Sequence, residues 1–175
     1  MARLWALAGA LMVCACASVE PSPPPPMVTA FDPAEMEWAK APGPNRIRGD
    51  GFLRTRGGDV KTCAGLDVWL VPVSNYTAEW ASRNYDGQNG GYKPKLMSLN
   101  PYPSLSQAAT QYVLAKKCDA QGRFAFESLA DGAYYVVATV TWEAPSQYGL
   151  ETQGGELAQR VDVAGGETKT ITLAR

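Results

Sequence analysis

Apolar and polar residues alternate most regularly in the second half of the chain. Residues 124–127 read Phe-Ala-Phe-Glu, and every residue from 134 to 142 is aromatic, β-branched or Ala. Such patterns are typical of strands, and Asp131-Gly132 between the two segments is a turn dipeptide. Residues 118–142 are therefore predicted to form a hairpin whose second strand lies at the centre of a β-sandwich. The side chains predicted to face the core are Phe124, Phe126, Tyr134, Val136 and Val140.

The same alternation predicts strands in the first half of the chain. A strand that starts at Arg46 would place Ile47, Gly49, Gly51 and Leu53 on one face, and a second strand would run from Val60 to Pro72. The integrin-type tripeptide Arg-Gly-Asp at residues 48–50 falls inside the first of these strands. Because that motif acts from an exposed loop tip, we interpret its occurrence here as chance.

The remaining strands are predicted near the middle and the end of the chain. Residues 106–117 are ambiguous, since their apolar positions also form a helical stripe, but we favour a strand over Thr110–Cys118. A last hairpin would pair Leu157–Val163 with Thr168–Ala174. The predicted fold is an all-β sandwich of about seven short strands, with one or two short peripheral helices.

The first of these helices is predicted just after residue 30. Asp32 is a suitable N-cap, Pro33 fits the first helical position, and Glu35 would complete a capping box. Phe31 is spaced to pack against Met36 as a hydrophobic staple. These signals mark residue 31 as the start of the folded domain, which would extend to residue 175.

A second helix is predicted over Thr77–Tyr85, and a long irregular loop follows over residues 84–105. This loop carries Tyr85, Tyr92 and Tyr102 among glycines and prolines. Together with Trp80, the three tyrosines can form an aromatic surface of the type that stacks on sugars or peptides. The alternative is that they fasten the loop to the sandwich.

Two sequence patterns resemble a known family. Gly122–Tyr134 follows the pattern GRFxFxxLxxGxY, and Gly58–Pro72 follows GxVxxCAGxxVxLxP. Both resemble the carboxypeptidase-regulatory-like domains, which are also called transthyretin-like or prealbumin-like. The resemblance implies a seven-stranded sandwich and names no ligand. Hydroxyisourate hydrolases of the same superfamily depend on histidines, and this chain contains none.

The N-terminal residues resemble a bacterial lipoprotein signal. Residues 1–15 contain Arg3 and a short apolar run, and Val13-Cys14-Ala15-Cys16 resembles a lipobox with Cys16 as the lipid-bearing cysteine. A frame ending at Cys14 fits less well, because Val13 is bulkier than the residue this motif requires. An ordinary signal peptide is the alternative.

A proline-rich segment separates this signal from the domain. Residues 16–30 include four consecutive prolines, which favour an extended conformation, so the segment is predicted to be a stiff tether. Ala17 stands where an Asp would retain a lipoprotein in the inner membrane. The predicted location is therefore the outer membrane, held by the N-terminal lipid and facing the periplasm.

Two cysteines remain in the predicted domain, Cys63 and Cys118. An even pair in an exported domain is most simply a disulfide. On the chain-entropy model, closing a loop of this size stabilises the fold by about 4 kcal/mol at most. A catalytic thiol is the alternative, but without histidine it would lack its usual partner.

Composition narrows the function. Lys and Arg number 16 against 17 for Asp and Glu, so no nucleic-acid partner is indicated. The absence of histidine removes the commonest general base and transition-metal ligand. Known catalytic motifs are missing, and no metal or other cofactor is indicated. We expect a non-catalytic envelope protein that binds a protein or carbohydrate; the alternatives are a structural partner docking a larger complex, and an enzyme of unrecognised type.

Cys16→Ser is predicted to abolish membrane attachment, because the lipid would supply affinity that a charge-balanced chain lacks. The variant should remain uncleaved or become soluble, which cell fractionation and immunoblotting can measure. A cleaved variant that still fractionates with membranes would contradict the lipoprotein interpretation.

Overall fold

The computed structural model describes residues 23–85, 87–95 and 102–175. The predicted signal, Cys16 and the first part of the predicted tether lie outside the described residues. The described part contains nine strands: β1 (Asn45–Arg54), β2 (Val60–Thr62), β3 (Asp67–Pro72), β4 (Gly90–Pro94), β5 (Leu114–Lys117), β6 (Arg123–Leu129), β7 (Gly132–Ser146), β8 (Gly149–Val163) and β9 (Thr168–Ala174). Two 3-10 turns, η1 (Pro33–Glu35) and η2 (Glu37–Lys40), and two α-helices, α1 (Asn75–Asn84) and α2 (Gln107–Thr110), complete it.

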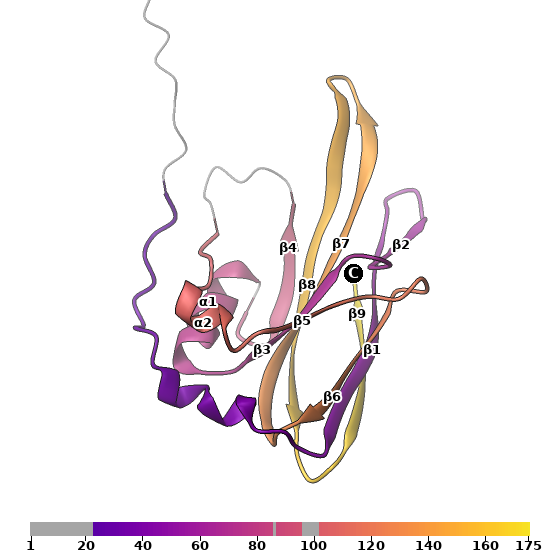
Figure 1. Ribbon diagram of the computed structural model, residues 1–175. Coiled ribbons are helices and arrows are strands. Elements are labelled where there is room, and N and C mark those ends of the chain that lie inside the picture. Colours follow the sequence, from indigo (N-terminus) through magenta and orange to yellow (C-terminus); the bar gives the residue numbers. More distant parts are fainter. Residues whose placement is uncertain (1–22, 86, 96–101) are drawn as a thin grey trace, which may run out of the picture.

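The strands form two sheets that pack as a sandwich (Figure 1). In the four-stranded sheet, β1 is central, with β9 parallel on one side and with β6 and β2 antiparallel on the other. The five-stranded sheet has the order β4-β8-β7-β3-β5, and all its pairs are antiparallel. The predicted all-β sandwich is confirmed, with nine strands in place of about seven. β7 is the middle strand of its sheet, as predicted.

Neither predicted hairpin exists as such. β6 pairs with β1, whereas β7 pairs with β3 and β8, so the 130–131 turn carries the chain from one sheet to the other. The turn after β8 does the same, because β9 pairs with β1. The alternation of apolar and polar residues indicates which face of a strand is buried, but it does not indicate which neighbouring strand pairs with it. The pattern therefore predicts where the strands of these two hairpins lie, and it does not predict their partners.

Asn45 joins these two crossings. Its side chain is fully buried, and its Nδ2 donates to the Leu129 carbonyl (3.0 Å) and to Asp131 Oδ1 (2.7 Å). Its Oδ1 accepts the backbone N–H groups of Gly166 and Glu167 at 2.8 and 3.1 Å. One amide therefore fixes the turn after β6 and the turn after β8 at the same end of the sandwich.

Two more predicted strands are shorter than expected. The segment predicted as one strand over 60–72 divides into β2 and β3, which lie in different sheets, because residues 63–66 turn at Gly65 with φ of +71°. The strand predicted over Thr110–Cys118 is only β5. Thr110 instead ends the short helix α2, which Ser106 caps by accepting the Ala109 N–H.

The predicted core residues face inward. Phe124, Phe126, Tyr134, Val136 and Val140 all lie in the apolar cluster between the sheets, each exposed by 5% or less. The predicted disulfide is also confirmed, since Cys63 and Cys118 are bonded with their Cα atoms 5.7 Å apart. It connects the residue after β2 to the residue after β5, and so ties the four-stranded sheet to the edge of the five-stranded one.

Helix α1 covers the outer face of the five-stranded sheet. Ser74 caps it with a reciprocal capping box to Thr77, and Trp80 and Ala81 pack over Val71 and Val137. This helix was predicted, although it begins two residues earlier than Thr77. No described helix combines the length and apolarity needed to cross a bilayer.

The helix signals after residue 30 produce only 3-10 turns. Asp32 accepts the Ala34 N–H, as an N-cap should. The predicted capping box fails, however, because Glu35 instead accepts the Asn75 backbone N–H and side-chain amide. The Phe31 ring packs against Tyr76 and Tyr112. Contacts with α1 and with Tyr112, which follows α2, therefore hold this segment against the domain.

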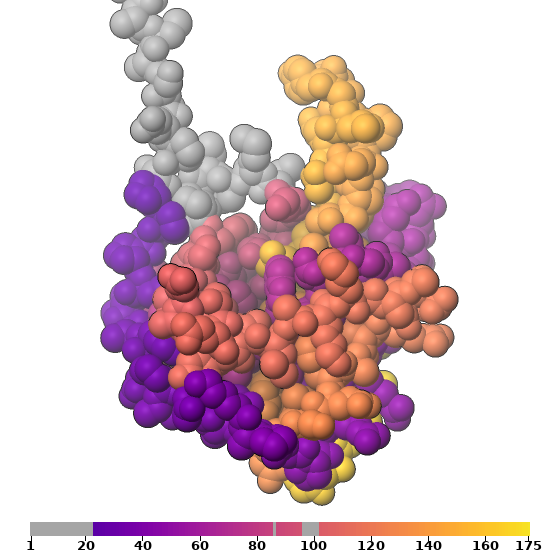
Figure 2. All heavy atoms as spheres, viewed as in Figure 1, coloured from indigo at the N-terminus to yellow at the C-terminus, as the bar shows by residue number. Residues whose placement is uncertain are grey.

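β7 and β8 continue beyond the sandwich as a two-stranded arm. Their pairing runs unbroken from Gly132↔Val163 to Ser146↔Gly149. Figure 2 shows the arm standing clear of the body. Tyr148 and Leu150 near its tip are 85% and 72% exposed. The sequence pattern did not predict this arm.

The last residues of the predicted tether lie against α1. Glu79 accepts the backbone N–H groups of Val28 (2.9 Å) and Thr29 (2.6 Å), while Arg83 donates to the carbonyls of Pro25 and Pro26. The described part of the proline-rich segment is therefore bound to the domain through backbone N–H groups and through backbone carbonyl groups.

Phe126→Ala is predicted to cost about 3–5 kcal/mol of unfolding free energy, because it leaves a cavity in the inter-sheet core. Urea melting monitored by circular dichroism measures this loss. Tyr148→Ala on the exposed arm is the control and should change stability little. A loss below about 1 kcal/mol for Phe126→Ala would contradict its position in the core.

Docking of the N-terminal segment is predicted to weaken in acid. Hydrogen bonds from the Thr29 hydroxyl and from the N–H groups of Val28 and Thr29 hold the pKa of Glu79 at about 2, below its ordinary 4.5. Since the folded pKa is depressed, the contribution is complete above pH 4.5 and is lost as the pH falls toward 2. Amide chemical shifts of Val28 and Thr29, followed by NMR, should titrate in this range. Glu79→Gln should abolish that titration, and a midpoint near 4.5 would contradict the docking.

Candidate functional site

A groove of about 460 Å³ lies on the outer face of the five-stranded sheet. β3 and β5 supply its floor, α1 one wall, and the segment 102–105 another. Alternation along β3 explains the floor: Val68 and Leu70 face the core, so Trp69 and Val71 face outward. The lining residues are Trp69, Val71, Trp80, Asn84, Lys93, Tyr102, Pro103, Ser104, Leu105, Thr110, Val113, Ala115 and Glu156.

The apolar part of the groove contains three aromatic side chains. Trp69 is half-buried on the sheet, Trp80 is 7% exposed, and Tyr102 is half-buried on the opposite wall. The Trp80 ring meets the ring of Tyr85 edge to face, with centroids 5.6 Å apart. Trp80 is thus held rigidly by its neighbours, while Trp69 and Tyr102 present partly open ring surfaces to the groove.

The polar part is a connected set of side chains. Lys93 Nζ lies 2.5 Å from Glu156 Oε2 and donates to Asn84 Oδ1 at 3.3 Å. Asn84 Nδ2 donates to the carbonyls of Trp80 and Pro103, which holds the 102–105 segment against α1. Tyr85 donates its hydroxyl to Glu156 Oε2 at 3.0 Å. The pairing leaves one cation and one anion at the groove with no net charge.

The environment of Tyr85 shows that it is structural. Burial and the neighbouring Glu156 carboxylate both raise the pKa of this phenol well above its ordinary value. Its ring, 5% exposed, packs against Trp80, with the Lys93 ammonium 5.7 Å from its centroid. Tyr85 therefore stays neutral and serves as a hydrogen-bond donor that positions Glu156.

The structure separates the four predicted binding residues. Trp80 and Tyr102 line the groove, and Tyr85 lies beneath it. Tyr92 lies in β4, within the segment predicted to be an irregular loop, and alternation turns its ring to the opposite face of the sheet from Lys93. Its hydroxyl donates to the Gly154 carbonyl at 2.8 Å. Residues 86 and 96–101 of that predicted loop lie outside the described residues.

Tyr92 contributes to a different hollow, between the arm and the β1–β2 turn. This hollow of about 680 Å³ also contains Trp142 and Arg56. A Cβ on Gly154 would come within 2.9 Å of the Trp142 ring, and one on Gly155 within 2.9 Å of the Tyr92 ring. The two glycines therefore let both rings lie directly on the β8 backbone.

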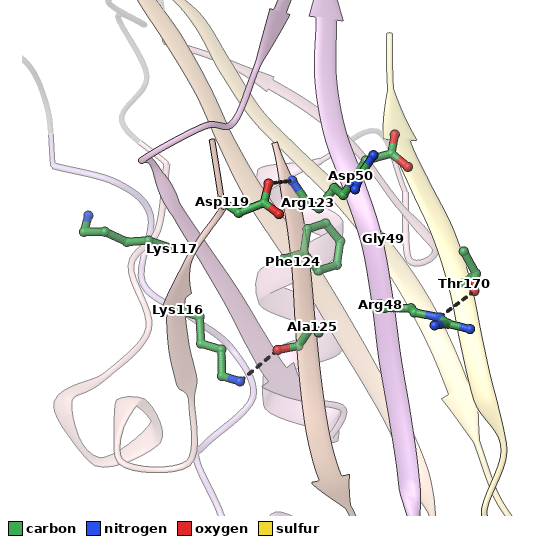
Figure 3. Close-up of a pocket in the computed structure, with 10 residues that line it drawn as sticks. All are labelled: Arg48, Gly49, Asp50, Lys116, Lys117, Asp119, Arg123, Phe124, Ala125 and Thr170. Carbon is green, nitrogen blue, oxygen red and sulfur yellow. Dashed lines mark hydrogen bonds between the residues drawn. The ribbon is translucent and has the colours of Figure 1, made fainter. Parts of the chain in front are cut away.

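A third hollow, of about 540 Å³, lies over β1 and β6 (Figure 3). Its lining is mostly charged, and the figure shows Lys116 reaching from β5 to the Ala125 carbonyl of β6, a hydrogen bond of 2.8 Å. Arg48 and Asp50 of the Arg-Gly-Asp tripeptide belong to it. They lie within a strand that is paired on both sides, as the sequence predicted.

Sequence reasoning missed several groove residues. The position of Trp69 was informative, because a large aromatic side chain on the outer face of a strand is usually covered by another element or by a ligand. The positions of Lys93 and Glu156 were not informative, since they meet only when β4 pairs with β8. Among the described residues no group of three or more potential metal ligands occurs. The lining of the groove combines aromatic rings with hydrogen-bonding side chains.

Comparisons with known proteins agree with the fold. No family model matches the chain, and no curated protein matches it. The chain is similar to a crystal structure from Pseudomonas aeruginosa described as that of "a putative carbohydrate binding protein". The TM-score is 0.71 at 25% sequence identity, over 84% of this chain and 99% of the other. The neighbour is described as a binding protein and not as an enzyme.

Proposed function

We propose that this protein is a non-catalytic module that binds carbohydrate in the groove between Trp69 and Tyr102. The observation that carries the proposal is the pairing, in one groove, of partly open aromatic rings with the Lys93–Glu156 pair. Aromatic faces suit the apolar faces of sugar rings, and a charged donor and acceptor suit sugar hydroxyls. The description of the structural neighbour supports the same class of ligand.

The groove's polarity favours a neutral saccharide. Lys93 and Glu156 compensate each other, so an ionic ligand would gain no net attraction there. Their side chains remain 18% and 23% exposed, which leaves them accessible to a ligand. Because Asn84, Tyr85 and Trp80 fix these groups in advance, little side-chain entropy would be lost on binding.

A cellular location is also proposed. We propose that the protein is anchored through a lipid on Cys16 to the outer membrane and faces the periplasm. The resemblance of Val13–Cys16 to a lipobox supports the anchor. Docking of Pro25, Pro26, Val28 and Thr29 on α1 would shorten the tether and hold the domain close to the membrane.

The exposed arm favours a second function, that of a scaffold docking a larger envelope complex. Tyr148 and Leu150 are large apolar side chains in water at the tip of a rigidly paired hairpin. Exposed apolar groups of this kind often mark protein contacts. Crosslinking of intact envelopes, comparing Tyr148→Ser with the parent protein, distinguishes this function from saccharide binding.

Tyr102→Ser is predicted to weaken saccharide binding about fivefold or more, since loss of a central aromatic contact costs more than about 1 kcal/mol. Maltohexaose, cellohexaose and chitohexaose are suitable probes. Their binding is measured by calorimetry and by tryptophan fluorescence, to which Trp69 on the groove floor contributes. The melting temperature should change little, because Tyr102 is only half-buried.

Tyr148→Ser makes the same chemical change at the arm tip and serves as the matched control. It should bind the saccharides as the parent protein does. Absence of binding to all three probes, or binding lost in Trp142→Ala and kept in Tyr102→Ser, would contradict the groove assignment. The second outcome would move the site to the hollow between the arm and the β1–β2 turn.

A further inference from the structure

The hollow over β1 and β6 results from one small residue among long charged ones. On the outer face of the four-stranded sheet, Arg48 of β1 stands between Ala125 of β6 and Thr170 of β9. Ala125 leaves a depression next to Arg123, one pleat along β6. Lys116 crosses from the edge of β5 to close the depression on its open side (Figure 3).

Cations predominate in this hollow although the chain as a whole carries a net charge of −1. Four basic side chains, Arg48, Lys116, Lys117 and Arg123, line it, against two acidic ones, Asp50 and Asp119. Asp119 is occupied by the backbone N–H groups of Gln121 and Arg123, and Asp50 accepts the Thr172 hydroxyl. The local field is therefore positive.

Much of the hydrogen-bonding capacity of the cations is unused. Among the described residues, Arg48 donates only its Nε, to Thr170 Oγ1 at 3.4 Å, and its two terminal nitrogens make no hydrogen bond or ion pair. In the same part of the chain, Lys116 gives one of its three donors to the Ala125 carbonyl and makes no other hydrogen bond. Within the described residues, no hydrogen bond or ion pair engages the side chain of Arg123, which stands opposite Asp50 in the register. Lys117 is paired with Asp67.

The surroundings of the hollow are polar and rich in hydroxyl groups. Thr168, Thr170 and Thr172 form an exposed row along β9 beside Arg46 and Arg48 of β1. None of the exposed large apolar side chains of the described residues lines the hollow. A protein partner would find no apolar anchor here, and the ring of Phe124, 5% exposed, offers no surface for stacking nucleic-acid bases.

We propose that this hollow binds the carboxylate groups of an acidic polysaccharide of the uronate type. Arg48, Arg123 and Lys116 would pair with a carboxylate seated over Ala125, and the β9 threonines would bond neighbouring sugar hydroxyls. Guanidinium groups favour such oxyanions through paired hydrogen bonds. The site shares with the proposed function the saccharide class of its ligand, but it lies on the other sheet and takes a charged ligand that the neutral groove would not select.

The test compares two double variants that lose the same charge. Arg48→Gln/Arg123→Gln removes two cations of the hollow, and Arg56→Gln/Lys61→Gln removes two cations near the β1–β2 turn, outside it. Hexagalacturonate is titrated into each variant and into the unmodified chain by calorimetry, at about 20 mM and about 500 mM NaCl. Its methyl ester, a thymidine hexanucleotide and sodium sulfate are the comparison ligands.

Hexagalacturonate should bind at low salt, bind more weakly at high salt, and lose about tenfold or more in affinity only in Arg48→Gln/Arg123→Gln. The proposal would be overturned by equal losses in both double variants or by the absence of binding at low salt. It would also be overturned by undiminished binding of the methyl ester, by tighter binding of the oligonucleotide, or by displacement of hexagalacturonate by an equal concentration of sulfate. Arg123→Gln alone, at an exposed side chain, decides the matter if the double variant unfolds. Tyr102→Ser should leave this affinity unchanged, so failure here and failure of the groove are separate results.

Discussion

The fold depends on burying both faces of β7. Five consecutive residues, Tyr134 to Ala138, are almost inaccessible to water, so alternate side chains point to opposite sides and both sides need a cover. The four-stranded sheet covers Tyr134, Val136 and Ala138, while α1 covers Tyr135 and Val137. Burying each large apolar side chain of β7 stabilises the fold by about 1.5–3 kcal/mol. The fold therefore depends on keeping both faces of this strand covered. The groove exists because α1 covers only part of the outer face and leaves Trp69 at its margin.

A sandwich whose consecutive strands change sheets needs its crossings fixed, and Asn45 meets this need. Its four hydrogen bonds engage both turns that carry the chain between sheets at one end of the molecule. A buried amide left with unmade bonds costs about 1–3 kcal/mol, so a competing arrangement of these turns is disfavoured. Beside β5, the Cys63–Cys118 disulfide and the hydrogen bond from Lys116 to the Ala125 carbonyl connect the edge of one sheet to the edge of the other.

Sequence reasoning located most strands because a half-buried strand must alternate. Residues 124–140 were placed correctly down to the inward side chains, since a shift of one residue would expose both phenylalanines. Pairing was not predictable, because the bonds of Asn45 and the parallel contact of β9 with β1 join residues more than 80 positions apart. The arm was not predictable for a different reason. Residues 143–152 bury little side-chain surface, so no alternation of apolar and polar residues marks them as strands.

The candidate sites were harder to predict than the fold, and the tyrosines show why. Tyr85, Tyr92 and Tyr102 share one segment of sequence, yet they end in different places. Tyr85, at the end of α1, is buried; Tyr92, in β4, lines the hollow between the arm and the β1–β2 turn; and Tyr102 lines the open groove. Composition identifies the tyrosines, but the pleat of β4 turns Tyr92 away from the groove and Lys93 toward it. The same pleat places Lys93 beside Tyr102, with its ammonium 5.6 Å from that ring. The lining of the groove therefore depends on strand register, because a one-residue shift of β4 against β8 would exchange the faces on which Tyr92 and Lys93 lie.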